Sequence, residues 1–218
     1  MAQIQTRGRL VEAPPVRISR KSLRSVREDA KLCRDCPLWR DATQTVFGEG
    51  RAHASVMLVG EQPGDQEDLT GKPFVGPAGK ILDKALNELA VDRSAVYITN
   101  AVKHFKFEMR GKRRLHKKPA DVEIAACHQW LEREIALIQP TLIVAMGATA
   151  ARSIFGRATA IERNRGHVIE RQTSGAAADI LVTIHPSFLL RMPPQDKPAA
   201  FKRFVDDLRL ALPYLNSA

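Results

Sequence analysis

The 218-residue sequence is poor in cysteine, in long apolar runs and in nucleotide-binding motifs. Three scattered cysteines are too few for the disulfide framework of a small secreted protein. The longest mostly apolar run, Leu142 to Ala151, is too short to span a bilayer, and the first ten residues contain no apolar signal region. Neither a GxxxxGKS/T nor a clean GxGxxG motif is present. We therefore expect a cytoplasmic protein with no membrane partner.

The positive charge of the chain is confined to two segments. The formal net charge is +10, but residues 1–36 hold nine Lys/Arg against four Asp/Glu, and residues 103–118 hold eight against one. The rest of the chain has a slight acidic excess. Focused basic segments are typical of proteins that bind polyanions, most often nucleic acid. A solvated charged loop is the alternative interpretation.

Hydrophobic periodicity predicts an α/β protein. We expect buried strands at residues 55–60, 95–100, 141–146 and 180–184, helices at 19–32, 77–89, 119–138, 148–155 and 199–211, and an edge strand at 167–171. Because strands alternate with helices, the expected fold is a three-layer α/β/α sandwich around a central four-stranded, mainly parallel sheet. Residues 1–18 are expected to form a flexible basic arm, and residues 19–218 a single domain.

Polar motifs follow the predicted strands, where ligands of parallel sheets bind. GEQPGDQED at residues 60–68 follows the first strand, Asn100 ends the second, and His185-Pro186-Ser187 follows the fourth. In GKPFVGP at 71–77, Phe74 is either a stacking platform for a flat ligand or a plug in the core. Basic and aromatic residues alternate from 103 to 107, which fits a ligand with phosphates and bases.

The cysteine spacing suggests a metal centre. Cys33 and Cys36 form a CxxC pair, and Cys127 lies 91 residues beyond Cys36. Three thiolates leave one tetrahedral position open, for which His104 and His128 are the candidates. This chemistry favours structural zinc, with an iron–sulfur cluster second and three unrelated free thiols as the remaining interpretation.

GEQPGDQED, GKPFVGPAG, TNAVKH and HPS, in this order and spacing, resemble the uracil-DNA glycosylase superfamily from about Cys33 to the final helix. Gln62 and the inserted Lys112-Arg113-Arg114-Leu115-His116 are most similar to the X-type branch (UdgX) related to family 4. Ordinary family 4 enzymes have Ala at the Gln position and lack the insert, whose usual form has Ile where this chain has Leu115. The resemblance implies a [4Fe-4S] cluster held by three cysteines, with His104 at the fourth ligand position; structural zinc is the alternative.

The resemblance also assigns roles to the strand-end residues. Asn100 would read the uracil edge, Phe74 would stack on the base, His185 would hydrogen-bond uracil O2, and Gln62 and Asp65 would complete the uracil site. An amide pairs with uracil O4 and N3–H, whereas cytosine presents the reversed pattern. DNA contacts are expected from Lys103, Lys112, Arg113, Arg114, Ser187, Leu190 and Arg191.

In the X-type branch, the histidine of the insert captures the sugar after the base has left. His116 matches this position, and Glu61 is the expected proton acceptor. The predicted products are free uracil and DNA joined through His116 to C1′, formed in a single turnover on single-stranded and also double-stranded DNA. A turnover family 4 glycosylase of base excision repair is the main alternative, and a zinc-containing DNA-binding module is another. We expect a monomer associated with the bacterial nucleoid.

Overall fold

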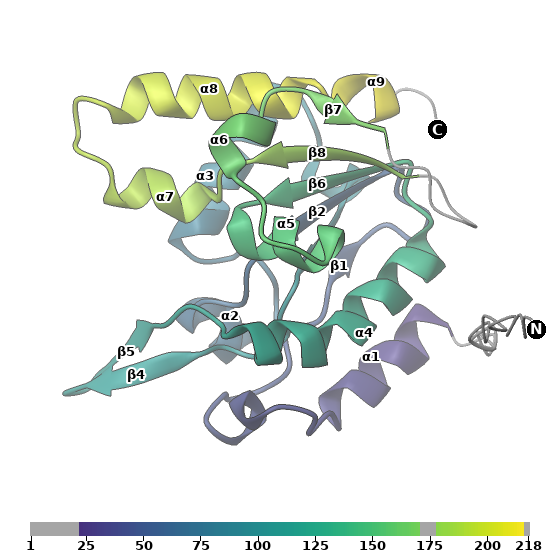
Figure 1. Ribbon diagram of the computed structural model, residues 1–218, viewed down its shortest axis with the longest axis vertical. Coiled ribbons are helices and arrows are strands. Elements are labelled where there is room, and N and C mark those ends of the chain that lie inside the picture. Colours follow the sequence, from purple (N-terminus) through teal and green to yellow (C-terminus); the bar gives the residue numbers. More distant parts are fainter. Residues whose placement is uncertain (1–21, 171–177, 216–218) are drawn as a thin grey trace, which may run out of the picture.

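The computed structural model describes residues 22–170 and 178–215, which form a three-layer α/β/α sandwich (Figure 1). The central sheet has the strand order β1-β3-β2-β6-β8-β7. The four predicted strands are confirmed as its parallel centre, β3, β2, β6 and β8, and the short edge strands β1 and β7 pair antiparallel. The strands are β1 Glu49–Gly50, β2 Val56–Gly60, β3 Tyr97–Asn100, β6 Leu142–Met146, β7 Val168–Ile169 and β8 Asp179–Thr183.

Helices cover both faces of the sheet, as the alternating pattern predicts. One apolar cluster joins β2, β3, β6 and β8 to α3, α7 and α8, and a second joins the opposite face to α4 and α5. The longer helices are α1 Leu23–Lys31, α3 Pro77–Glu88, α4 Asp121–Ile138, α5 Ala148–Phe155 and α8 Lys197–Arg209. The short helices are α2 Asp65–Thr70, α6 Ile161–Asn164, α7 Pro186–Arg191 and α9 Leu212–Leu215, with 3₁₀ turns at Pro37–Arg40 and Arg93–Ala95.

Local sequence explains where the predicted helices begin. Pro77 occupies the first turn of α3, where its missing N–H is not needed. The first helix begins at Leu23, with the Ser22 side chain accepting a hydrogen bond from the Ser25 N–H at 3.2 Å. The predicted start of this helix at residue 19 and the arm at 1–18 lie outside the described residues.

The basic segment folds into a hairpin that the hydrophobic pattern did not predict. Strands β4 Phe107–Arg110 and β5 Arg113–His116 pair antiparallel, with Phe107 opposite His116. Gly111 lies in the two-residue turn with a φ of +61°, a conformation that glycine adopts without strain. The hairpin places His116 at its root, beside the sheet, and the turn at its far tip.

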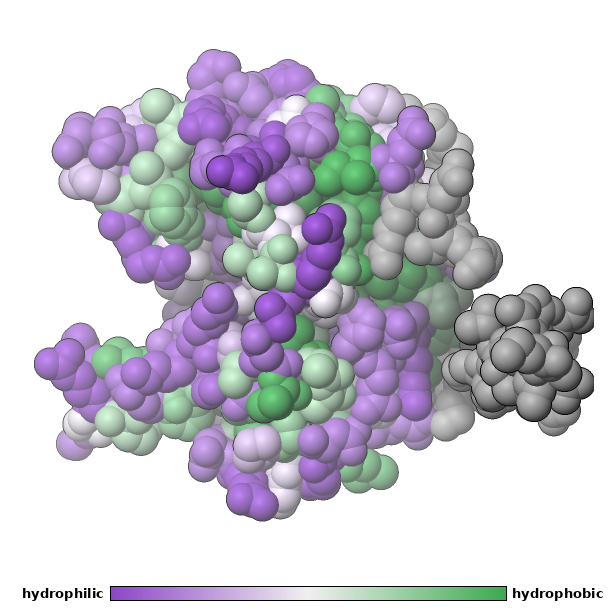
Figure 2. Space-filling model, viewed as in Figure 1, coloured by the Kyte–Doolittle hydropathy of each residue, from purple (hydrophilic) through white to green (hydrophobic). Residues whose placement is uncertain are grey.

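The hairpin and α7 project from the carboxyl-end side of the parallel strands (Figure 1). Figure 2 shows a hollow between these two projections, with hydrophilic side chains along the hairpin. No helix among the described residues is long and apolar enough to cross a membrane.

Candidate active site

A cavity of about 1050 Å³ lies between the carboxyl ends of the strands, the hairpin and α7. It gathers most of the predicted site residues from five separate segments of the chain. Ten of them line it: Glu61, Gln62, Asp65, Phe74, Asn100, His116, His185, Ser187, Leu190 and Arg191. Because parallel strands end at the same edge of the sheet, motifs that lie far apart in the sequence meet in one place.

Two buried side-chain atoms in this cavity have no hydrogen-bond partner among the described residues. They are Asn100 Oδ1, at the end of β3, and His185 Nε2, just after β8. A buried polar atom without a partner is costly, so such atoms mark positions where a ligand completes the hydrogen bonding. Gly60 leaves room for this arrangement, since a Cβ there would overlap Asn100 Oδ1 and the Phe74 ring.

The protonation of His185 follows from its contacts. Its Nδ1 accepts the backbone N–H of Ser187 at 3.2 Å and lies 2.8 Å from Ser187 Oγ. A backbone N–H can only donate, so Nδ1 is an acceptor and the neutral ring carries its proton on Nε2. Burial lowers the pKa of His185 to about 4, against an opposing attraction from Glu61. At neutral pH the cavity therefore presents an uncharged N–H donor beside an amide acceptor.

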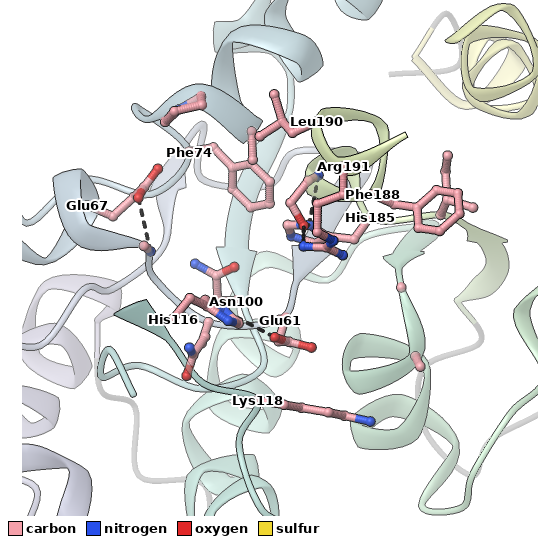
Figure 3. A pocket seen from close by; sticks show the side chains of 18 of the residues that line it. Glu61, Glu67, Phe74, Asn100, His116, Lys118, His185, Phe188, Leu190 and Arg191 are labelled. Atoms are coloured by element: carbon pink, nitrogen blue, oxygen red, sulfur yellow. Dashed lines mark hydrogen bonds and ion pairs between the residues drawn. The ribbon is translucent and has the colours of Figure 1, made fainter. Parts of the chain in front are cut away.

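Phe74 forms an aromatic wall next to His185. Its ring is buried, and its centroid lies 5.7 Å from that of the imidazole (Figure 3). Its backbone has a φ of +54°, which is strained for a bulky residue and is typical of functional sites. The loop is held by Glu67, whose carboxylate accepts the N–H groups of Gly64, Val75 and Gly76 at 3.0, 3.0 and 2.7 Å. Sequence reasoning missed Glu67, although the dense acidic motif contains it.

Glu61 and His116 face each other in the cavity (Figure 3). His116 Nε2 lies 3.2 Å from Glu61 Oε1, and Thr149 Oγ1 donates to Glu61 Oε2 at 2.5 Å. Burial alone would raise the pKa of Glu61, but the hydrogen bonds from His116 and Thr149 outweigh it and lower the pKa. An ionised carboxylate thus lies next to a half-exposed imidazole in the same cavity as Asn100 and His185.

Gln62 and Arg114 anchor the hairpin to the sheet. The Gln62 amide donates to the carbonyls of Lys106 and Lys117 at 3.1 and 3.0 Å and accepts the Lys106 N–H at 3.1 Å. Arg114 pairs with Asp65 and Asp68, each at 2.6 Å. The predicted uracil contacts of Gln62 and Asp65 and the DNA contact of Arg114 stay predictions, because in this structure these side chains bind other parts of the protein.

The structure contradicts the predicted DNA contact of Lys103. Its side chain is 1% exposed and donates to Glu134 Oε2 at 2.5 Å, to Thr99 Oγ1 at 2.7 Å and to the Asn100 carbonyl at 2.7 Å. A lysine enclosed in this way cannot reach a phosphate. The sequence shows the charge of Lys103, but it does not show that Glu134 on α4 pairs with this charge.

The remaining predicted DNA residues lie on the hairpin and on α7. Lys112 and Arg113 are exposed on the hairpin, and Arg191 lies on the cavity rim with Nη1 3.5 Å from Ser187 Oγ. Leu190 is 43% exposed, next to Phe188 at 45%, and both line the cavity. Sequence reasoning missed Phe188 and the cavity-lining Lys118, although the latter belongs to the basic run.

The three cysteines contact one apolar cluster between α1, the segment at 37–47 and α4. Cys33 Sγ accepts the Trp130 indole N–H at 3.2 Å, and Cys127 Sγ accepts the Lys103 N–H at 3.2 Å. Burial raises the pKa of the Cys127 thiol to about 12. Within residues 22–170 and 178–215, no three His, Cys, Asp or Glu side chains are arranged to hold a metal ion. The predicted metal centre therefore stays a prediction.

The other two candidate metal ligands have protein partners. His104 Nε2 lies 2.9 Å from Thr45 Oγ1, and burial lowers the pKa of His104 to about 4. His128 Nδ1 lies 3.2 Å from Ser153 Oγ, and its Nε2 lies 3.2 Å from Glu132 Oε1. His104 directly follows Lys103, whose backbone N–H donates to Cys127 Sγ, and His128 directly follows Cys127 itself.

Comparison with known proteins agrees with this geometry. The model of the uracil DNA glycosylase superfamily matches residues 47–209. The chain is 40% identical over 168 residues to a type-4 uracil-DNA glycosylase of Thermotoga maritima, covering 76% of this chain and 82% of the relative. It is 34% identical over 192 residues to a type-4 enzyme of Pyrobaculum aerophilum, covering 86% and 92%. A type-5 uracil-DNA glycosylase of P. aerophilum is 30% identical over 181 residues, covering 75% and 74%.

Proposed function

Because the chain belongs to the uracil-DNA glycosylase superfamily, we propose that it removes uracil from DNA by cleaving the N-glycosidic bond. The observation that carries the proposal is a pair of buried cavity atoms, Asn100 Oδ1 and His185 Nε2, for which the described part of the chain offers no hydrogen-bond partner. One is an acceptor and the other an N–H donor, and both lie beside the aromatic wall formed by Phe74.

This pair matches the edge of uracil. Asn100 Oδ1 accepts the N3–H of the base, the Asn100 amide donates to O4, and His185 Nε2–H donates to O2. Cytosine has an unprotonated N3 and an amino group at C4, so both contacts with the Asn100 amide would be mismatched. A site built around buried hydrogen-bonding groups rejects such a base strongly, because its own groups lose their partners.

Cleavage then follows from charge. As the C1′–N1 bond breaks, its electron pair moves into the uracil ring and positive charge develops on the sugar. The Nε2–H of His185 stabilises the negative charge at O2, and the Glu61 carboxylate, whose pKa is lowered, supplies the negative charge proposed to stabilise the cationic sugar. The base must first leave the DNA stack to expose C1′ to these groups.

The attacking group distinguishes two versions of this function. In the first, water adds to C1′, and the protein releases uracil and abasic DNA over many turnovers in base excision repair. The comparisons fit this version better than covalent capture, because the relatives are named type-4 uracil-DNA glycosylases. In this version Glu61 is the residue that takes a proton from the water.

Covalent capture through His116 is a second candidate, as in the X-type branch. It is supported by the place of His116 in the cavity, 3.2 Å from Glu61, at the root of a hairpin that carries the inserted segment. The new bond would join an imidazole nitrogen to C1′, and Glu61 would accept the displaced proton. An N-alkylated imidazole has no ready route to hydrolysis, so each molecule would act once.

A single assay tests the function and separates its two versions. The protein is incubated with excess single-stranded DNA that contains one uracil, followed by quantification of free uracil and a denaturing gel. Turnover predicts many uracils per protein molecule and abasic DNA without an adduct. Capture predicts one uracil per molecule and a band shift that survives heat and SDS and disappears in His116→Ser. Absence of uracil release, with thymine-containing DNA as control, would contradict the proposed function.

DNA is proposed to bind across the mouth of the cavity, between the hairpin and α7. Exposed Lys112 and Arg113 supply positive charge on one side, and Arg191 supplies it on the other. Leu190 lies at the rim, where an apolar side chain can fill the space that the flipped base vacates. The Ser187 hydroxyl, held next to His185 Nδ1, is the proposed phosphate contact on this side.

We also propose that Cys33, Cys36 and Cys127, with His104, hold a [4Fe-4S] cluster. The three thiols fit such a group because they contact one set of packed apolar side chains. N–H donors also point at two of the sulfurs, as is common for the ligands of iron–sulfur clusters. When bound, this group would connect α1, the 37–47 segment and α4.

Anaerobic purification is expected to yield about four iron and four acid-labile sulfide per chain, as for other cysteine-held [4Fe-4S] sites. His104→Cys should keep this content because a thiolate replaces the imidazole, while Cys127→Ala should lose it. Iron and sulfide assays, together with visible absorption, make the measurement. A preparation with stoichiometric zinc and no sulfide would refute the cluster.

A further inference from the structure

The buried ion pair between Lys103 and Glu134 lies directly behind the proposed uracil-reading residue. The Lys103 ammonium is 1% exposed and the Glu134 carboxylate is fully buried, with 2.5 Å between Nζ and Oε2. Lys103 Nζ also donates to the backbone carbonyl of Asn100 at 2.7 Å. We propose that this pair is a positioning device for uracil recognition, in which Lys103 fixes the backbone from which the Asn100 amide projects. The inference rests on the proposed function.

Asn100 needs such a support. Its Oδ1 is buried without a partner among the described residues, so this atom gains no hydrogen bond in the unbound orientation and would turn toward any available donor. On one side the Asn100 amide lies close to the Gly60 backbone, where an added Cβ would overlap both Asn100 Oδ1 and the Phe74 ring. The backbone is held by the N–H groups of Ala101 and Val102, which donate to the carbonyls of Gly60 and Glu61, each at 3.0 Å, and by Lys103.

Lys103 is itself held at both ends by α4. Its backbone N–H donates to Cys127 Sγ at 3.2 Å, and its ammonium pairs with Glu134, which lies two helical turns further along the same helix. The Lys103 carbonyl accepts the N–H of Val46 at 2.8 Å. The position of Asn100 therefore depends on α4, and through Cys127 on the apolar cluster that the three cysteines contact.

Glu134 is shared between this device and the rest of the core. Its Oε1 accepts the Tyr97 hydroxyl at 2.8 Å and the Gly48 N–H at 2.9 Å, and Thr99 Oγ1 lies 3.0 Å from each carboxylate oxygen. A buried ion pair is weak evidence for a role in stability, because apolar replacements of the whole pair often fold equally well. The direct hydrogen bond from Lys103 to the Asn100 carbonyl instead indicates that the pair holds Asn100 in position.

The test compares two variants that each remove a different partner of the Glu134 carboxylate. Lys103→Met with Glu134→Gln removes the ammonium and leaves no buried charge, while the glutamine still accepts from Tyr97 and Gly48. We expect a fall in kcat for uracil release of about 10-fold or more, typical of a misplaced recognition group, with unchanged affinity for abasic-site DNA, which lacks the base that Asn100 reads. Tyr97→Phe is the matched control, since it removes a hydrogen bond to Glu134 Oε1, not to the Oε2 that binds Lys103, and should leave kcat near that of the wild type.

The outcomes are separable. If both variants lose kcat in proportion to their loss of thermal stability, or if the double variant keeps wild-type kcat, the pair is structural and the inference is wrong. If the double variant does not fold, the isosteric Thr99→Val replaces it: it removes an acceptor of the Lys103 ammonium, and an unchanged kcat would overturn the inference, whereas a roughly threefold fall at constant abasic-DNA affinity supports it. Failure of the wild-type protein to release uracil would instead refute the proposed function.

Discussion

Asn100→Asp is expected to reduce kcat/KM for uracil release by about 10³-fold, the scale on which a site loses a substrate whose buried hydrogen bonds are mismatched. The substitution preserves the shape of the side chain but removes the donor to O4 and places a carboxylate against that oxygen. Because Asn100 is 2% exposed, water cannot compensate for the mismatch. Uracil release from single-stranded DNA, measured with enzyme in excess, gives the effect directly.

Asn164→Asp is the matched control for this experiment. The Asn164 amide donates to the Ala160 carbonyl at 2.7 Å in α6, and the side chain is not among those that line the cavity. It should retain wild-type activity. An Asn100→Asp protein that is folded and still releases uracil within tenfold of the wild-type rate would contradict the proposed recognition, and with it the interpretation of the unpartnered Oδ1.

Glu61→Gln is expected to slow uracil release by about 10²- to 10⁴-fold, the range for loss of a general base or of an electrostatic stabiliser. Glutamine retains the shape and can still accept from Thr149, but it carries no charge to stabilise the sugar cation and takes no proton. The loss is therefore expected whether water or His116 attacks. Single-turnover rates across a pH series measure the loss. Any fall in the wild-type rate at low pH that comes from protonation of Glu61 should be absent from the variant.

The control for Glu61 is Glu162→Gln. Glu162 also lines the cavity, but its side chain is 66% exposed and pairs with the exposed Arg203 and with Arg165, whose side chain is 6% exposed, each at 3.4 Å. Its charge is screened by solvent, so its removal should change the rate by less than about threefold. Equal losses in the two variants would show that the cavity responds to total negative charge and not to the placement of Glu61.

The strand-end residues were predictable because parallel topology brings them together. Once four alternating strands were identified, Glu61, Asn100 and His185 had to share one edge of the sheet, whatever their separation in the sequence. The polar partners that fix each side chain were not predictable. Lys103 was assigned to DNA from its charge, because nothing in the pattern shows that Glu134, 31 residues later, encloses it.

Helical phase and hairpin register explain most of the other misses. On α7, Leu189 faces the core and is 3% exposed while its neighbours Phe188 and Leu190 face out, a distinction that a six-residue helix does not reveal in its sequence. The hairpin strands are too short and too charged to show a clear alternation, so residues 107–116 resembled a loop. Gln62 is in a strong motif, but its hydrogen bonds to the hairpin root depend on that unseen pairing.

The way the hairpin is anchored divides the inserted segment into two independent parts. Gln62 and Arg114 fix its root, whereas at the turn a Cβ added to Gly111 would meet nothing within 4 Å. Length, charge and even an attached fluorophore can therefore vary at the tip while the imidazole of His116 keeps its place. Changes at the hairpin tip, whether by evolution or by engineering, can therefore alter which nucleic-acid surface the protein binds. They leave the residues that contact the base unchanged.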